Sequence, residues 1–294
     1  MKLARRKNGW WRWPIGVAAG IVVLLLAVVF YMFRIEPQRL ELRRYEVRLH
    51  CWWPEHDGLT FMIIGDLHQR GGNRELRRLQ RIVTLANSCK PDVVLLLGDF
   101  IGSRTNRDYE NASPEVIAAS LHGLRSRYGV FAVLGNHDWW YNGERMRRAL
   151  TAVGVKVLEN EFYPLEIAGR TCNIIGLPDR TTRHERFDRR QLPDPSVPAV
   201  VLSHDPDFFP ELELPYELML SGHTHGGQIV LPGIGLLVAP SRYGNKYVYG
   251  LVEEEGRRLL VTSGTGTSII HARLFCPPEI VLLTVKKADS SSAE

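Results

Sequence analysis

The sequence has few cysteines and no short cysteine motif. Its four cysteines, Cys51, Cys89, Cys172 and Cys276, lie far apart and form no C-x-x-C pair. That spacing excludes zinc-ribbon and thioredoxin-like proteins. Cys172 and Cys276 lie in apolar runs, so we expect both to be buried free thiols.

The chain also lacks internal repeats, low-complexity blocks and any nucleic-acid reader motif. Its net charge is +5, but the basic excess is spread along the sequence. Without a reader motif this charge predicts no nucleic-acid partner, and it fits a surface beside an anionic membrane better. The 294 residues are 45% hydrophobic, which is enough for one large α/β domain, expected to be a monomer.

One long apolar run lies near the start of the chain. Residues 15–33 carry no charge and would form a helix about 28 Å long, close to the roughly 30 Å hydrocarbon core of a bilayer. Tryptophans at 10, 11 and 13 precede the run and Tyr31 lies near its end, as membrane-interface residues do. A cleaved signal peptide is the alternative, but no small-x-small cleavage site follows. We therefore expect an uncleaved single-pass anchor.

The charges that flank this run bear on membrane orientation. Basic residues are nearly balanced on the two sides: Lys2, Arg5, Arg6, Lys7 and Arg12 before it, and Arg34, Arg39, Arg43, Arg44 and Arg48 after it. A short basic N-terminus before a first span usually stays inside the cell. This favours a cell-membrane protein whose main domain lies outside the cytoplasm, with a cytoplasmic domain as the alternative.

We divide the chain into four parts: residues 1–34 as basic flank and anchor, 35–58 as a connector with an early strand at 45–53, 59–285 as the main domain, and 286–294 as a polar tail. The main domain opens with buried strands at 59–66, 92–99 and 130–138 that alternate with amphipathic helices at 73–88, 113–129 and 143–154. This βαβαβα order predicts a largely parallel sheet with right-handed crossovers.

Most of the later segments are typical of strands, and they predict a second sheet packed on the first, with helices outside. These strands are expected at 155–162, 163–169, 171–177, 199–205, 217–223, 259–264 and 279–285.

Side chains that can bind a metal follow five of the predicted strands. In order they are Asp66 and His68; Asp99; Asn136, His137 and Asp138; His204; and His223 and His225. Each alone has an ordinary explanation as a helix cap, a turn residue or a structural histidine. Ligands of open α/β sheets bind beyond the carboxyl ends of strands, so together these residues predict one site at one edge.

Two aspartates, one asparagine and four histidines are too many ligands for one zinc ion. They suit two divalent ions, and Mn, Fe, Zn, Co and Ni all accept these donors. Two-metal sites clamp the attacking and leaving oxygens of an in-line displacement. The predicted reaction is therefore hydrolysis of a phosphoester or pyrophosphate bond by a hydroxide that bridges the metals.

The motifs D-x-H, G-D, G-N-H-D, a lone His and G-H-x-H, in this order, resemble the calcineurin-like metallophosphoesterase superfamily over about residues 59–285. "GHTHGGQ", "GNHDWW" and "GTGTS…RLFCPPEI" are similar to its membrane-attached bacterial members. The resemblance implies a four-layer α/β/β/α sandwich. Gly65 is a departure, because many relatives have serine or threonine there, and we expect it to be tolerated.

The same resemblance implies a role for each site residue. One metal would bind Asp66, His68, Asp99 and His225, and the other Asp99, Asn136, His204 and His223. His137 would contact the phosphate and protonate the leaving group, and Asp138 would orient His137.

The sequence leaves the substrate open. Trp139 and Trp140, or Trp52 and Trp53, would stack on a base or an acyl chain, or simply pack in the core. The basic segment 179–190 would bind phosphates or stay solvated. Similar proteins include enzymes that cleave the pyrophosphate of UDP-diacylglucosamine, a substrate that needs a cytoplasmic domain.

Two other functions remain as alternatives. A nuclease of the same superfamily predicts a continuous basic groove. A degenerate scaffold would have lost ligand residues first, and every expected ligand is present.

Overall fold

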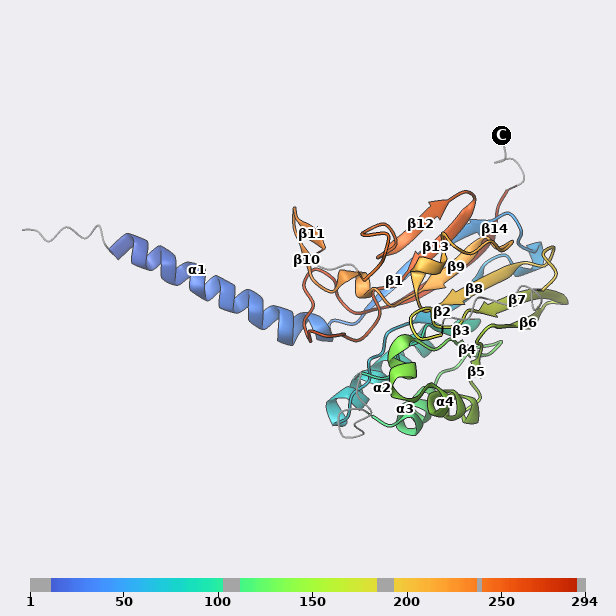
Figure 1. Ribbon diagram of the computed structural model, residues 1–294, viewed down its shortest axis with the longest axis horizontal. Helices are drawn as coiled ribbons and strands as arrows, with labels where there is room; N and C mark the ends of the chain where they lie inside the picture. Colours follow the sequence, from blue (N-terminus) through green and yellow to red (C-terminus); the bar gives the residue numbers. More distant parts are fainter. Residues whose placement is uncertain (1–11, 103–111, 184–192, 237–239, 290–294) are drawn as a thin grey trace, which may run out of the picture.

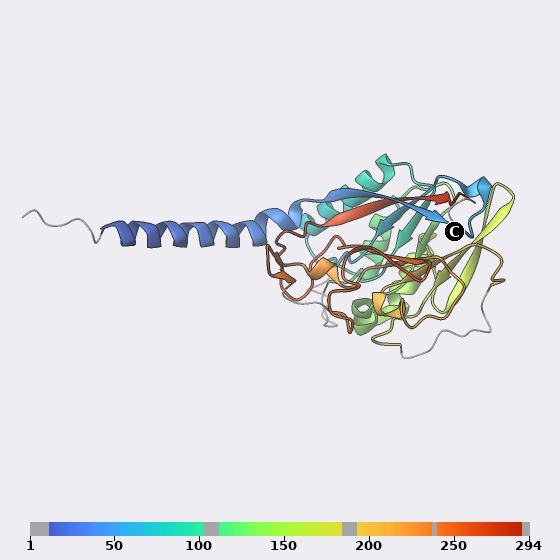
Figure 2. The same cartoon turned by 90° about the horizontal axis from the view of Figure 1, so that it is seen from above.

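The computed structural model describes residues 12–102, 112–183, 193–236 and 240–289. An apolar helix, α1 (Arg12–Phe30), projects from a body built around two facing sheets (Figure 1; Figure 2). The helix continues into a π-helical turn, Tyr31–Ile35, and a 3₁₀ turn, Glu36–Gln38. It is long and apolar enough to cross a membrane, and both a signal sequence and an anchor have these properties.

The first sheet has the strand order β1-β14-β2-β3-β4-β5. Its strands are β1 (Glu41–Leu49), β14 (Glu279–Lys287), β2 (Leu59–Ile64), β3 (Val93–Leu96), β4 (Val130–Ala132) and β5 (Lys156–Val157). Strands β2 to β5 are parallel, as the βαβαβα pattern predicted, whereas β14 is antiparallel to β2. The sheet is therefore mixed, and the connector supplies β1 at its edge.

The second sheet has the order β12-β13-β9-β8-β7-β6. Its strands are β12 (Gly250–Glu254), β13 (Arg257–Val261), β9 (Leu218–Ser221), β8 (Ala199–Ser203), β7 (Arg170–Gly176) and β6 (Glu161–Ile167). The inner strands are parallel and the two edge strands antiparallel. A separate hairpin joins β10 (Val230–Leu231) to β11 (Gly235–Leu236).

Three helices lie along the first sheet: α2 (Asn73–Ser88), α3 (Pro114–Leu121) and α4 (Asn136–Ala152). The predicted helix at 113–129 ends early, because Gly123 follows it and the side chain of Asn87 binds the backbone of Gly123 and Arg125. The predicted helix at 143–154 begins earlier, at Asn136. The G-N-H-D motif thus forms the start of α4 instead of the end of a strand.

The sequence placed two strands inaccurately and missed a third. Segments 155–162 and 163–169 form the short β5 and the longer β6, separated by a turn in which Asn160 adopts a positive φ of 58°. Strand β12 was not predicted, because its half-buried residues give neither a continuous apolar run nor a clear alternation.

Apolar side chains form the layers on either side of each sheet. Helices α2 to α4 pack on the outer face of the first sheet, where Leu79, Ile117 and Leu150 meet Met62 and Val94. The inner faces of the two sheets share a second cluster. Loops and the 3₁₀ turn Pro206–Phe208 cover the outer face of the second sheet. The two-sheet sandwich is confirmed, but in the described ranges no α-helix forms the expected fourth layer.

Candidate metal centre

The fold brings all the predicted site residues together at the carboxyl ends of strands from both sheets. Asp66 and His68 follow β2, and Asp99 follows β3; the first turn of α4 carries Asn136, His137 and Asp138; His204 follows β8, and His223 and His225 follow β9. Eight of these residues are at most 4% exposed, and His223 is partly exposed. Parallel strands that end at one edge explain why residues distant in sequence meet here.

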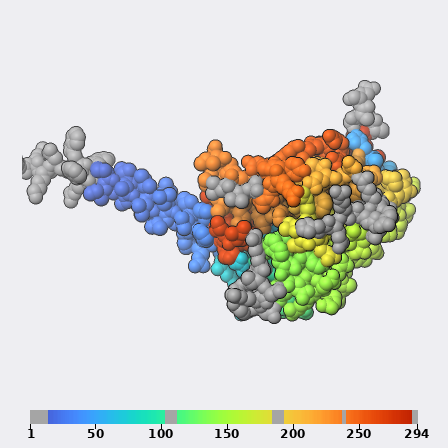
Figure 3. Space-filling view, viewed as in Figure 1, coloured from blue at the N-terminus to red at the C-terminus, as the bar shows by residue number. Residues whose placement is uncertain are grey.

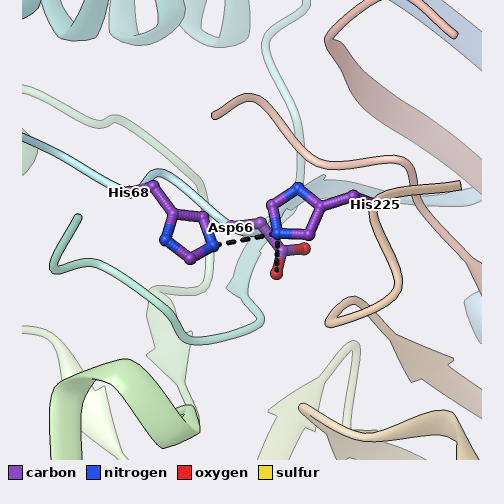
Figure 4. A group of neighbouring side chains, drawn as sticks. All are labelled: Asp66, His68 and His225. Atoms are coloured by element: carbon purple, nitrogen blue, oxygen red, sulfur yellow. Dashed lines mark hydrogen bonds and ion pairs between the residues drawn. The ribbon is translucent and has the colours of Figure 1, made fainter. Parts of the chain in front are cut away.

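One group of donor atoms surrounds Asp66. Nε2 of His68 lies 2.9 Å from Nε2 of His225, which lies 3.7 Å from Oδ1 of Asp66 (Figure 4). Nε2 of His68 also lies 3.4 Å from Oδ2 of Asp99. These atoms converge from three different loops.

A second group surrounds His204. Its Nε2 lies 3.1 Å from Nδ1 of His223, 3.2 Å from Oδ1 of Asn136 and 3.4 Å from Oδ2 of Asp99. Nδ1 of His204 lies 2.7 Å from the carbonyl oxygen of Leu97, so the ring carries its proton there and directs Nε2 into the site. Oδ2 of Asp99 is thus 3.4 Å from one imidazole of each group.

The backbone of the site is strained. Asp66, His68, Asp99, His223 and His225 all have a positive φ, between 42° and 70°. Non-glycine residues adopt this conformation at a cost of about 1–3 kcal/mol each, and they do so mainly where the surroundings enforce it. The N–H of His223 donates to both oxygens of Asp66, and the N–H of His137 donates to Oδ1 of Asp99.

Glycines leave room for the donor atoms of the site. A Cβ at Gly135 would lie 2.3 Å from Oδ1 of Asp99, and one at Gly222 would lie 2.5 Å from Oδ2 of Asp66. A Cβ at Gly65 would lie 3.2 Å from the methyl group of Thr262. The neighbour Thr262 therefore fills much of the space that a side chain at position 65 would use.

Burial and mutual charge set the protonation of the site. Burial raises the pKa of Asp66 to about 7 and lowers the pKa values of His68 and His225 well below the ordinary histidine value. Burial opposes charge on Asp99 and His204 too, but their attraction outweighs it. The pKa of Asp99 is therefore lowered and that of His204 raised.

The donor set fits metal ions. The donor atoms form three groups, and within each group the atoms lie at most 4.8 Å apart. The groups are Asp66, His68 and His225; His68, Asp99 and His137; and Asp99, His204 and His223. Nδ1 of His68 and of His225 is buried without a hydrogen-bond partner in the described ranges, whereas Nε2 of each ring lies near the other donor atoms. Imidazole nitrogens and carboxylate oxygens are the ligands that borderline divalent cations prefer, so the residues fit a dinuclear metal site.

His137 and Asp138 occupy different surroundings. The His137 ring stands edge-on to His68, with centroids 4.5 Å apart, and 5.0 Å from the Trp140 ring. The carboxylate of Asp138 accepts hydrogen bonds from the N–H groups of Phe100, Ile101 and Gly135. Asp138 therefore holds together the loops after β3 and β4, and its orienting effect on His137 stays a prediction.

A pocket of about 370 Å³ adjoins the donors. Its lining combines Asp99, Asn136, His137, His223 and His225 with the apolar side chains Trp140, Ile229, Pro240, Ile269 and Ile270. Trp139 instead stacks with Arg183, whose guanidinium lies 4.3 Å from its ring. Trp52 is buried in the core and the indole N–H of Trp53 donates to Thr171, so this pair has the packing role. Of the basic segment 179–190, residues 184–190 lie outside the described ranges.

Sequence reasoning missed Arg273, which is fully buried behind the site. Its guanidinium donates to the carbonyl oxygens of Ser263, Gly264, Gly266 and Cys276 at 2.6–3.2 Å. Gly266 in turn donates its N–H to the carbonyl of Asp66. An arginine between two apolar runs, in "HARLFC", was the available signal.

The chain is similar to a known family and to several known proteins. The family model described as calcineurin-like phosphoesterase matches residues 59–227. The chain is 28% identical to the uncharacterized metallophosphoesterase YkuE of Bacillus subtilis, over 88% of this chain and 90% of that protein. It is 30% identical to phosphodiesterase YaeI of Escherichia coli, over 86% and 91%. It is 26% identical to UDP-2,3-diacylglucosamine pyrophosphatase LpxG of Chlamydia trachomatis, over 92% and 97%.

Proposed function

The chain belongs to the calcineurin-like phosphoesterase family and is a metallophosphoesterase, and we propose that it hydrolyses a phosphodiester or pyrophosphate bond at a membrane surface. The observation that carries the proposal is the position of Asp99. One carboxylate oxygen lies 3.4 Å from His68 in one donor group and 3.4 Å from His204 in the other, at the wall of an open pocket.

We assign the ligands by these distances. One metal would be held by Asp66, His68, Asp99 and His225, and the other by Asp99, Asn136, His204 and His223. Both groups converge on Asp99, which supports a shared carboxylate. Residues 59–285 form the catalytic domain in this proposal, with β1 of the connector added to its first sheet.

The chemistry divides between the ions and the chain. Two divalent cations would supply Lewis-acid activation of the phosphoryl group and of the attacking water. His137 lines the pocket and would protonate the leaving oxygen. The backbone N–H of His137 donates to Asp99, and Asp138 binds the backbone of the loops around it. These contacts position the His137 ring before substrate binds.

We propose α1 as an anchor, with the catalytic domain outside the cytoplasm.

Two relatives carry names that indicate a substrate class: YaeI is named a phosphodiesterase, and LpxG a UDP-2,3-diacylglucosamine pyrophosphatase. Cleavage of UDP-diacylglucosamine by this chain is the second candidate, and it requires a domain on the cytoplasmic side.

Nuclease activity is less well supported. The described residues that line the pocket include no lysine or arginine, whereas a nucleic-acid groove needs basic side chains along the backbone path. A degenerate scaffold is also disfavoured, because the fold assembles every expected donor.

A hydrolysis screen of the full chain in detergent with added Mn²⁺ tests the proposed function. Bis-p-nitrophenyl phosphate reports diesterase activity, p-nitrophenyl phosphate reports monoesterase activity, and nucleoside diphosphate lipids report pyrophosphate cleavage. Asp99→Asn is the matched inactive control. Turnover that Asp99→Asn leaves unchanged, or no turnover of any substrate, would refute the proposal.

A further inference from the structure

Four large apolar side chains are exposed on one surface of the catalytic domain. The exposed fractions are 74% for Ile234, 76% for Ile269, 50% for Ile270 and 63% for Phe275. Single exposed apolar residues are ordinary, but a group at one place marks an interaction surface. We call these four side chains the apolar rim.

Hydrogen bonds join the two segments that carry the rim. Gln228 accepts from the N–H of Ser268 and donates to the carbonyl oxygens of Ser268 and Ile270. Val230 at the base of the β10–β11 hairpin donates its N–H to Leu274. The hairpin that bears Ile234 and the loop that bears the other three residues are therefore one unit.

The rim lies where α1 meets the catalytic domain. The N–H of Arg273 donates to the carbonyl of Met32 at 3.0 Å, and the N–H of Cys276 donates to the carboxylate of Glu36 at 2.6 Å. Both bonds tie the rim loop to the end of the apolar helix. The hairpin and this loop lie on the side of the domain where α1 joins it (Figure 1; Figure 3).

The rim also continues into the active-site pocket. Ile269 and Ile270 line that pocket together with Asp99, His137 and His225. An apolar wall therefore runs from the exposed rim to the metal donors. A wall that is continuous with an exposed apolar surface fits an amphiphilic substrate whose hydrocarbon part lies beside the phosphate group.

We propose that the apolar rim inserts into the bilayer that α1 enters, so that the pocket opens onto the membrane and takes a lipid-linked phosphodiester or pyrophosphate. The inference rests on the proposed anchor and hydrolase. The occupant follows from this continuity, because a helix whose residues 14–30 are all exposed ends at the rim. Exposed Arg34 and Arg39 at the helix end match anionic headgroups.

Site-directed fluorescence on the full chain tests this placement. Ile234→Cys and Phe275→Cys, made in a background with Cys51→Ser and Cys89→Ser, carry an environment-sensitive NBD probe. Neither residue lines the pocket. Val116→Cys on α3, another exposed aliphatic position, is the matched control. The chains are reconstituted into phosphatidylglycerol–phosphatidylethanolamine vesicles, with or without lipids that carry a nitroxide quencher near the headgroup.

Labels at 234 and 275 should shift to the blue and be quenched by the nitroxide lipids, and the label at 116 should do neither. Labels that report water at both positions would overturn the proposal. A blue shift without quenching that grows with protein density would assign the rim to a second copy of the chain, and would overturn it as well.

Activity on the same vesicles separates this inference from the proposed function. Ile234→Ser combined with Phe275→Ser should lower hydrolysis of a vesicle-embedded phosphodiester lipid by about tenfold and leave hydrolysis of soluble bis-p-nitrophenyl phosphate unchanged. If the labels report membrane contact but no substrate is hydrolysed, only the proposed hydrolase function is refuted. If both substrates are hydrolysed and the double variant changes neither rate, only the membrane insertion of the apolar rim is refuted.

Discussion

Nε2 of His68 lies 2.9 Å from Nε2 of His225 inside a buried site. Burial lowers the pKa of both rings, so both are neutral, and two neutral imidazoles at this distance can share only one proton between them. Divalent ions would satisfy both lone pairs and the carboxylates beside them. Metal binding should therefore stabilise the native state.

Removal of metal should lower the melting temperature. An ion present at about 1,000 times its Kd adds roughly 4 kcal/mol to the free energy of unfolding. Thermal unfolding with Mn²⁺, after treatment with a chelator and after Mn²⁺ is returned, measures the effect, with Asp66→Asn as the comparison. A transition that is the same in all three states of the unaltered chain would contradict the expected coupling.

Gly222→Ala should impair the site while the fold survives. The added Cβ would lie 2.5 Å from Oδ2 of Asp66, and both must move because Asp66 is fully buried. We expect a fall in Mn²⁺ affinity of at least about tenfold, the size of effect seen when a ligand loses its supporting contacts. Titration by calorimetry measures the affinity. Gly20→Ala, where nothing lies within 4 Å of the new Cβ, is the control and should bind normally.

The position of the ligands could be predicted because parallel strands of known direction end at one edge. Asp66 and Asp99 each follow an apolar run in the first sheet and His204 follows one in the second, and the two facing sheets bring the three together. The positive φ of His223 could not be predicted, since its backbone N–H is held by Asp66, a residue distant in the sequence. Pairing of β1 with β14 was equally hidden, because it joins segments more than two hundred residues apart and has no local signal.

His137→Gln should lower kcat by about 10²- to 10⁴-fold, the usual contribution of a general acid, without loss of metal. The prediction separates two functions for this ring, since its nitrogen also lies within 4.8 Å of donors from His68 and Asp99. Steady-state kinetics and metal analysis of the same sample decide between them. Loss of one metal ion would make His137 a ligand. His50→Gln, an exposed histidine away from the site, should change neither quantity.

Arg273→Met should destabilise the catalytic domain. The variant leaves the buried carbonyl oxygens of Ser263, Gly266 and Cys276 without the guanidinium that binds them. Unsatisfied buried acceptors cost about 1–3 kcal/mol each, so we expect a loss of about 3 kcal/mol or more in the free energy of unfolding. Urea unfolding followed by circular dichroism measures it. Arg48→Met, half-exposed, should shift the midpoint little.

Glu36 connects the end of the apolar helix to the metal centre. It is buried, and its carboxylate binds the N–H of Cys276, whose thiol lies 3.3 Å from the carbonyl of His225. Glu36→Ala removes the acceptor and should cost about 1–3 kcal/mol of stability. Because His225 lies at the other end of this chain of contacts, Mn²⁺ affinity should fall too. Glu36→Gln keeps an acceptor oxygen and should restore the affinity. If Glu36→Ala lowers stability but leaves metal affinity intact, the contact supports the fold and does not position the ligand.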